Sequence, residues 1–339
     1  MIDLIVAGAG PVGLMTAIHA RLAGLSVTVV EPRSGVIDKA CGEGLMPDAL
    51  ARLQAIGVDP EGLDFLGIRY LAGETVAEAR FRAGPGRGVR RTELQDALRR
   101  RACELGAVLV TDRVDAITQG EDWIEAAGVR GRYLVGADGL HSGVRRTLGL
   151  GTRSSGRQRF GIRQHFAVAP WTDLVEVHWL DDVEVYVTPV GPQTVGVAVL
   201  GEAPLDLDGA VRRLPALARH LESAQRVSQP RGAGPLRQRV AARRSGRALL
   251  VGDAAGYVDA LTGEGLRVGF AEAESVVQAL AADDPARYEQ QWHRITRSYR
   301  WLTGGLLWAA SRRRLRPMIV PAARALPPVF GRVVDSLAA

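Results

Sequence analysis

The sequence predicts an α/β fold, because three apolar segments far apart in the chain end at glycines and lead into helix-like patterns. They are residues 2–7, 133–136 and 248–252. Short apolar runs bounded by glycine are typical of buried parallel strands. Residues 155–235 instead contain runs in which apolar and polar residues alternate, as in antiparallel strands. We therefore expect a parallel sheet flanked by helices and a second, antiparallel sheet.

The first unit contains a glycine-rich turn suited to a dinucleotide. Gly8, Gly10 and Gly13 fit the pattern G-x-G-x-x-G directly after the first strand. Gly8 allows a tight turn, Gly10 lets the backbone approach a pyrophosphate, and Gly13 lets the helix pack closely on the strand. The N-terminus of that helix offers free N–H groups to the phosphates. A second strand ends at Glu31, whose carboxylate can accept hydrogen bonds from ribose hydroxyls and would repel a 2′-phosphate. These features predict FAD or NAD rather than NADP.

Two later segments repeat the pattern of a strand that ends at an aspartate. They read "YLVGADGLHSGVR", with Asp138, and "ALLVGDAAGYVDALTGEGL", with Asp253. A carboxylate at such a strand end can bond to a ribose or ribityl hydroxyl. A helix beginning near Leu266 can point its positive end at the carbonyl side of a flavin ring. Each segment alone also fits an ordinary turn with aspartate as the turn residue.

Together and in this order, the three segments resemble the FAD-dependent monooxygenase superfamily, which includes aromatic-ring hydroxylases, epoxidases and geranylgeranyl reductases. The resemblance covers residues 2 to about 282. It implies an α/β fold with a Rossmann-like FAD-binding domain of the glutathione-reductase type, an inserted antiparallel β-sheet substrate domain and C-terminal helices. The implied FAD-binding domain comprises about 1–50, 88–155 and 240–282, the substrate domain about 51–87 and 156–239, and a helical cap about 283–339.

The resemblance also implies which residues bind FAD. It places Asp138 near the pyrophosphate, Asp253 near the ribityl chain, and Arg91, in "VRRTELQDALRRRA", near the pyrophosphate. Val114 lies where a backbone contact with adenine is usual. The full set of predicted cofactor-binding residues is Gly8, Gly10, Pro11, Val12, Gly13, Glu31, Pro32, Arg33, Cys41, Gly42, Arg91, Val114, Asp138, Gly139, Gly252, Asp253, Gly263, Gly265 and Leu266.

The stretch "DKACGEGLMP" contains the only lysine of the chain, Lys39, and one of its two cysteines, Cys41. It resembles the Lys-x-Cys-Gly segment of the geranylgeranyl reductase branch, as does "DALTGEG", although Ala260 stands where that branch usually has proline. The resemblance puts this loop against the flavin, where Lys39 would stabilise an anionic reduced ring and Cys41 would take part in the chemistry. The alternative is a small buried cysteine in a loop shaped by glycines.

Three runs, "VEVHWL", "VEVYVTPV" and "TVGVAVL", predict antiparallel strands with one covered face. In the resembled family such a sheet covers the substrate pocket. The run "VEVYVTPV" occupies the place of the family's Tyr-x-Trp-x-Phe-Pro segment. Its tyrosine, Tyr186, is a candidate catalytic residue together with Lys39 and Cys41. Val187 and Thr188 replace the usual aromatic residues, so the pocket wall is less aromatic. Tyr186 and His165 face the pocket or, alternatively, occupy ordinary core or edge positions.

These features predict an FAD-dependent oxidoreductase. Only one dinucleotide motif is present, so NAD(P)H must dock transiently as the electron donor. Because the chain and its C-terminal region are short, we predict a monooxygenase that uses O₂ on a hydrophobic aromatic or isoprenoid small molecule. The motif details favour the alternative, reduction of prenyl C=C bonds. A non-catalytic flavin-binding protein is a further alternative.

Composition excludes other classes. The 339 residues include only two cysteines, which cannot form a disulfide framework, and no Cys/His spacing suggests a metal site. The net charge of +6 comes from arginines spread along the chain, so we expect no nucleic-acid partner. The chain opens with a strand-like run, and no apolar run reaches the roughly 20 residues that span a bilayer, so a cytoplasmic location is expected. From about Pro285, apolar patches alternate with arginines, which predicts a helical cap or a weak membrane-surface contact.

Overall fold

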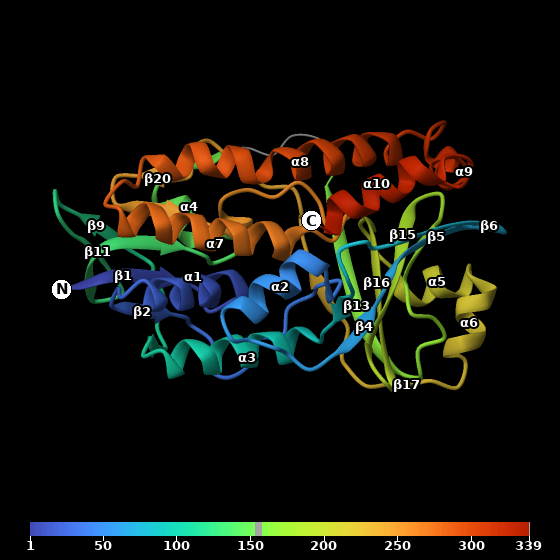
Figure 1. The fold of residues 1–339 in the computed structure, drawn as a ribbon, viewed down its shortest axis with the longest axis horizontal. Helices are drawn as coiled ribbons and strands as arrows, with labels where there is room; N and C mark the ends of the chain where they lie inside the picture. The colour runs from blue at the N-terminus through green and yellow to red at the C-terminus, as the bar shows by residue number, and fades with distance from the viewer. Residues whose placement is uncertain (153–157, 339) are drawn as a thin grey trace.

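The computed structural model describes residues 1–152 and 158–338, which form two eight-stranded sheets surrounded by helices (Figure 1). Five strands of the first sheet are parallel and follow the order β21 (Ala248–Leu250), β11 (Val129–Gly136), β1 (Ile2–Ala7), β2 (Val27–Val30) and β8 (Val108–Val110). Antiparallel strands extend it, namely β20 (Arg244–Ser245), β10 (Ile124–Ala126) and β9 (Ile117–Gln119). The three apolar segments identified in the sequence are therefore neighbouring strands.

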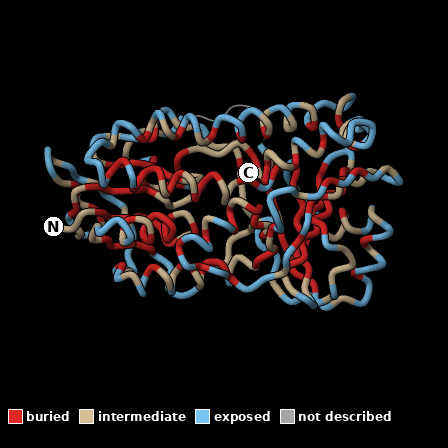
Figure 2. The backbone as a smooth tube through the Cα atoms, viewed as in Figure 1, coloured by how far each residue is buried: buried red, intermediate tan, exposed pale blue. Residues whose placement is uncertain are grey.

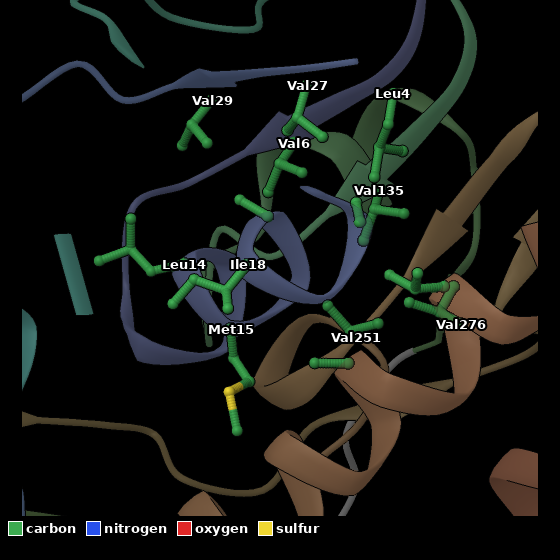
Figure 3. Close-up of a cluster of buried hydrophobic side chains, with 14 of the residues drawn as sticks. Leu4, Val6, Leu14, Met15, Ile18, Val27, Val29, Val135, Val251 and Val276 are labelled. Carbon is green, nitrogen blue, oxygen red and sulfur yellow. The ribbon is translucent and has the colours of Figure 1, made fainter. Parts of the chain in front are cut away.

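The parallel register brings the three glycine-containing turns to one edge of the first sheet. Ala7 pairs with both Val30 and Gly136, and Gly136 pairs with Leu250, so β1, β2, β11 and β21 end together. Two helices begin at that edge, α1 (Pro11–Leu22), which packs on β1 and β2, and α7 (Gly265–Ala281), which packs on α1. Figure 3 shows Leu14, Met15 and Ile18 of α1 in one apolar cluster with valines from the strands and from α7.

The second sheet has the order β17 (Gln225–Arg226), β13 (Arg159–Ala167), β16 (Thr194–Glu202), β15 (Val183–Gly191), β14 (Val175–Trp179), β5 (Gly67–Ala72) and β6 (Thr75–Arg80), with β18 (Arg231–Ala233) also paired to β13. The three predicted strands are β14, β15 and β16. The prediction of one covered face is wrong, because eight of the nine residues of β15 are buried (Figure 2). Helices α5 (Leu207–Arg212) and α6 (Pro215–Leu221) cover one face, and C-terminal helices cover part of the other.

The remaining elements connect the two sheets or cover them. Short strands β3 (Gly44–Leu45), β7 (Gly86–Gly88) and β4 (Leu63–Phe65) form a small sheet, and β12 (Gly151–Thr152) pairs with β19 (Arg239–Val240). The other helices are α2 (Pro47–Ala55), α3 (Arg91–Glu104), α4 (Gly143–Thr147), α8 (Arg287–Ala310), α9 (Ile319–Ala325) and α10 (Pro327–Ala338). Figure 1 shows α8 running along α7 toward the second sheet. None of the helices in the described part is long and apolar enough to cross a membrane.

A buried charge cluster ties the C-terminal segment to the second sheet. The guanidinium of Arg316 lies 2.7 Å from the carboxylate of Glu184 on β15, and Arg159 on β13 bonds the same carboxylate at 2.5 Å. Arg159 also pairs with Asp259 at 3.1 Å, just before the Thr-Gly-Glu-Gly turn. Burial raises the pKa of Asp259 to about 6 despite this pair. Because buried charges need partners, the cluster fixes the C-terminal segment, the sheet and the turn relative to one another.

Candidate active site

A large cavity lies where the ends of the parallel strands meet the second sheet. The space between its walls is about 1760 Å³, including a part that is open to solvent. Most of the predicted site residues line it, although they come from widely separated parts of the chain. The predicted residues in its lining are Gly8, Gly10, Pro11, Val12, Glu31, Arg33, Lys39, Cys41, Gly42, Arg91, Asp138, Gly139, Tyr186, Gly252, Asp253, Gly263, Gly265 and Leu266.

Three predicted cofactor-binding residues lie outside this lining. A Cβ atom on Gly13 would be 1.9 Å from the carbonyl oxygen of Gly8, so Gly13 serves the close packing of α1 on the strand. Pro32 is exposed and Val114 is partly buried. Contacts of Pro32 and Val114 with FAD stay predictions.

The glycine-rich turn leaves space for a phosphate. Gly8 has a φ of +105°, which favours glycine, and a Cβ on Gly10 would meet no heavy atom within 4 Å. Helix α1 begins at Pro11 with no side-chain cap, so its N-terminal N–H groups remain available to an anion at the cavity wall. The carboxylate of Glu31 accepts the N–H of Ala9 at 3.0 Å and closes the turn. This cradle fits the pyrophosphate and ribose of a dinucleotide.

The two aspartates at the strand ends present carboxylate oxygens to the same region. Oδ2 of Asp138 accepts the N–H of Val144 at 3.0 Å, whereas its Oδ1 is buried with no partner among the described residues. Buried polar atoms normally have a partner, and a cofactor hydroxyl would supply one. Arg145, which sequence reasoning did not single out, donates to the backbone carbonyls of Asp253, at 3.2 Å, and Leu140, at 2.6 Å. It therefore holds both aspartate turns together.

Residues 38–44, which we call the 38–44 loop, bring Lys39 and Cys41 to the cavity. The amine of Lys39 lies 3.2 Å from the carboxylate of Asp253, and a Cβ on Gly139 would be 3.2 Å from that amine. The sulfur of Cys41 accepts the N–H of Glu43 at 3.4 Å and faces the guanidinium of Arg91 at 3.9 Å. Lys39 thus lies beside the residues predicted to bind the ribityl chain and the pyrophosphate.

Sequence reasoning missed a buried polar network behind this loop. Glu43 is 2% exposed and its carboxylate lies 2.6 Å from Nε2 of His165 on β13. Arg163 donates to Asp38 at 2.6 Å, and Thr188 donates to the carbonyl of Gly42 at 2.9 Å. The one signal in the sequence was an acidic residue between two glycines. In this network Asp38, Gly42 and Glu43 bond to side chains that lie more than 100 residues away, on the second sheet.

The part of the cavity against the second sheet is apolar. The hydroxyl of Tyr186 donates to the carbonyl of Leu261 at 2.7 Å, and burial together with nearby Glu184 raises its pKa well above 10. Tyr186 therefore lines the cavity as a poor acid, and a catalytic role for it stays a prediction. The apolar residues around it are Met46, Phe65, Ile68, Tyr70, Val175, Val177, Ala198, Leu200, Leu236, Leu261 and Leu337. Such a wall suits a hydrophobic substrate.

Residues 1–284 match the family described as "FAD binding domain". The chain belongs to this FAD-binding family. It is 30% identical to the menaquinone reductase of Mycolicibacterium smegmatis, covering 86% of this chain and 79% of that protein. It is 26% identical to digeranylgeranylglycerophospholipid reductase 2 of Methanopyrus kandleri, covering 86% and 82%. It is 29% identical to the 3-(3-hydroxy-phenyl)propionate/3-hydroxycinnamic acid hydroxylase of Mycobacterium avium, covering 83% and 55%.

Solved structures share the fold of this FAD-binding protein. The flavin-dependent brominase Bmp2 superposes with a TM-score of 0.80 at 20% identity, covering 99% of this chain and 93% of that chain. The predicted family and fold class are therefore confirmed, and the protein is an FAD-dependent oxidoreductase.

Gly10→Val is expected to abolish FAD binding without unfolding the protein. Gly10 has a φ of −69° and open space at its Cβ position, so valine fits the backbone but fills the phosphate cradle. We expect FAD affinity to fall by about 100-fold or more, equivalent to about 3 kcal/mol, in a flavin-fluorescence titration. Gly304→Val, in α8, also meets open space and serves as the control. Wild-type FAD affinity in Gly10→Val would show that the cofactor binds elsewhere.

Proposed function

We propose that this protein uses NAD(P)H and FAD to reduce a carbon–carbon double bond of a hydrophobic, isoprenoid substrate. The observation that carries the proposal is the apolar wall of the cavity against the second sheet, which offers contact area to an isoprenoid chain and few groups to bind a polar one. The reductase relatives support it, because they match over most of their own length, whereas the hydroxylase from M. avium matches over 55%.

In this proposal, different residues of the chain bind the cofactor, bind the substrate and hold a proton. Bound FAD supplies the hydride. The turn around Gly10 and the N-terminus of α1 hold the pyrophosphate, and the positive charge of Lys39 balances Asp253 beside it. The apolar wall binds the substrate and excludes water. Cys41 lies at the cavity surface, where its thiol is placed to hold a proton. With a single dinucleotide motif, the nicotinamide donor docks only transiently.

A monooxygenase is the second candidate function. The hydroxylase relative from M. avium favours it, and the same apolar wall would accept an aromatic ring or an alkene. In that case O₂ would be a co-substrate, and the product would contain an added oxygen atom.

An anaerobic assay separates the two functions. The FAD-loaded protein is reduced with one equivalent of NADPH or NADH without oxygen, and then mixed with a prenylated quinone or a geranylgeranyl lipid. The proposal predicts that the substrate reoxidises the flavin and gains two hydrogen atoms, detected by mass spectrometry. Product that forms only in air, and carries oxygen from ¹⁸O₂, would instead establish the monooxygenase.

We also propose that the C-terminal helices touch an anionic membrane surface, from which a lipophilic substrate would reach the cavity. Trp301 is 77% exposed and Trp308 is 54% exposed, and both lie on one face of α8 because they are seven residues apart. Exposed Arg294 and Arg297 continue this face, and Arg312 stacks on the ring of Trp308 at 4.1 Å. Tryptophans among arginines suit the interface of an anionic bilayer, and Leu337 of α10 lines the cavity.

Vesicle sedimentation tests this contact. We expect the protein to bind vesicles containing phosphatidylglycerol more strongly than neutral phosphatidylcholine vesicles, and to be released by salt. Replacing both Trp301 and Trp308 with serine should abolish binding. The control replaces Val108 and Val76 with serine, since these apolar residues are exposed on other elements. Equal sedimentation of the tryptophan variant and the wild type would refute the contact.

A further inference from the structure

Adding hydrogen across a double bond consumes a proton as well as a hydride, and the tyrosines at the cavity are poor proton donors. Burial raises the pKa of Tyr70, Tyr186 and Tyr257 above that of an ordinary tyrosine. Lys39 is paired with Asp253. The lining also contains the carboxylates of Glu31 and Asp138, which are predicted to bind the cofactor, and the thiol and carboxylate of Cys41 and Glu43 in the 38–44 loop. We therefore consider Cys41 and Glu43 as the groups that exchange protons with the substrate. When the cofactor and the substrate fill the cavity, such a group needs a route by which it regains its proton.

We propose that Ser228, His165 and Glu43 form a proton relay from the edge of the second sheet to the cavity. The inference rests on the proposed function, because that reaction consumes the proton. Ser228 is half-buried, His165 is fully buried and Glu43 lines the cavity. Oγ of Ser228 lies 2.9 Å from Nδ1 of His165, whose Nε2 lies 2.6 Å from the carboxylate of Glu43.

The neighbours of His165 determine which ring nitrogen carries the hydrogen. The guanidinium of Arg163 lies 3.2 Å from Nδ1, and a guanidinium only donates hydrogen bonds. Nδ1 is therefore the acceptor, and Nε2–H donates to Glu43. The hydroxyl of Ser228 can then also donate to Nδ1, while its oxygen accepts the backbone N–H of His165 at 3.0 Å. Every hydrogen bond in the series points toward the cavity.

Several contacts hold the carboxylate of Glu43 in place at the end of the relay. Arg163 lies 3.5 Å from the carboxylate of Glu43 and also pairs with Asp38, which Arg231 contacts from the surface at 3.2 Å. The backbone N–H of Arg91 donates to the second carboxylate oxygen of Glu43 at 2.8 Å. Glu43 also has a φ of +60°, which is rare for a residue with a side chain. Its contacts hold it in this conformation.

The following transfers would supply the proton that the reaction consumes. His165 takes a proton at Nδ1 from the Ser228 hydroxyl, which water reprotonates, and passes the proton on Nε2 to Glu43. Protonated Glu43 gives its proton, directly or through the thiol of Cys41, to one carbon of the double bond. The other carbon receives the hydride, so the double bond becomes single and no other product forms. His165 is then left with its hydrogen on Nδ1, facing the guanidinium of Arg163. This contact of two donors favours rotation of the ring between turnovers, until its N–H again donates to Glu43 and its bare nitrogen again accepts from Arg163.

The second sheet contains a matched control pair. His178 on β14 lies 3.4 Å from the carboxylate of Glu176, and both residues are buried, but neither lines the cavity. His165→Gln, Glu43→Gln and His178→Gln are first shown to carry FAD. We expect the first two to lose about 100-fold or more in anaerobic product formation, the scale of general acid catalysis, and His178→Gln to match the wild type. His165→Gly should be rescued by added imidazoles, with rates that follow their acidity.

A measurement without turnover distinguishes failure of the relay from failure of the proposed function. In protein with ¹⁵N-labelled histidine, NMR should show His165 as the Nε2–H tautomer with a strongly downfield proton. That signal should disappear in Glu43→Gln and persist in His178→Gln. An Nδ1–H tautomer, or full product formation by FAD-loaded His165→Gln, would overturn the relay. If the wild type itself forms no reduced product, the proposed function fails, and the NMR result alone decides whether His165 donates to Glu43.

Discussion

Buried charges hold the 38–44 loop against the second sheet, and the shape of the cavity depends on this attachment. Asp38 and Glu43 extend from the loop to Arg163 and His165 on β13, and Thr188 on β15 bonds the loop backbone. Removing one partner of a buried charge pair costs about 3–5 kcal/mol, because the other charge stays uncompensated. The loop therefore has one favoured position, in which Lys39 and Cys41 face the cavity.

A second group of interactions fixes other parts of the cavity wall. Arg145 joins the turns that carry Asp138 and Asp253, and the Glu184 cluster joins the Thr-Gly-Glu-Gly turn to the second sheet and the C-terminal segment. Side-chain contacts therefore hold the turns and the loop that line the site in position, as preorganised binding requires. The same fold carries reductases, hydroxylases and a brominase. Reaction type must therefore follow from side chains such as those of the loop and the apolar wall.

Local sequence patterns predicted those helices, strands and turns whose geometry depends on a few neighbouring residues. Gly8, Gly10 and Gly13 predicted a turn and a helix that the structure contains, because their roles depend on backbone geometry over a few residues. The strands around Tyr186 were also predicted, but not the burial of both their faces. That burial depends on helices that come later in the chain, such as α5 and the C-terminal α10. No local pattern of polar residues in the strands reveals it.

The polar network could not be predicted for the same reason. Glu43 and His165 are 122 residues apart and meet only through the fold. Arg163 and His165 are two positions apart in their strand, as polar residues on a solvent-facing side of a sheet usually are. Both are nevertheless buried. Lys39 was predicted near the flavin ring from resemblance alone. The structure places its amine 3.2 Å from the carboxylate of Asp253, and its contact with the flavin stays a prediction.

The position of Lys39 provides the most direct test of this account. Lys39 is the only lysine in the chain, so reductive methylation with ¹³C-formaldehyde yields just two NMR signals, from Lys39 and the N-terminal amine. Methylation keeps the positive charge. If the loop holds Lys39 at the FAD site, titration with FAD should shift the Lys39 signal in proportion to bound cofactor and leave the N-terminal signal unchanged. A Lys39 signal that does not move while FAD binds would contradict the account.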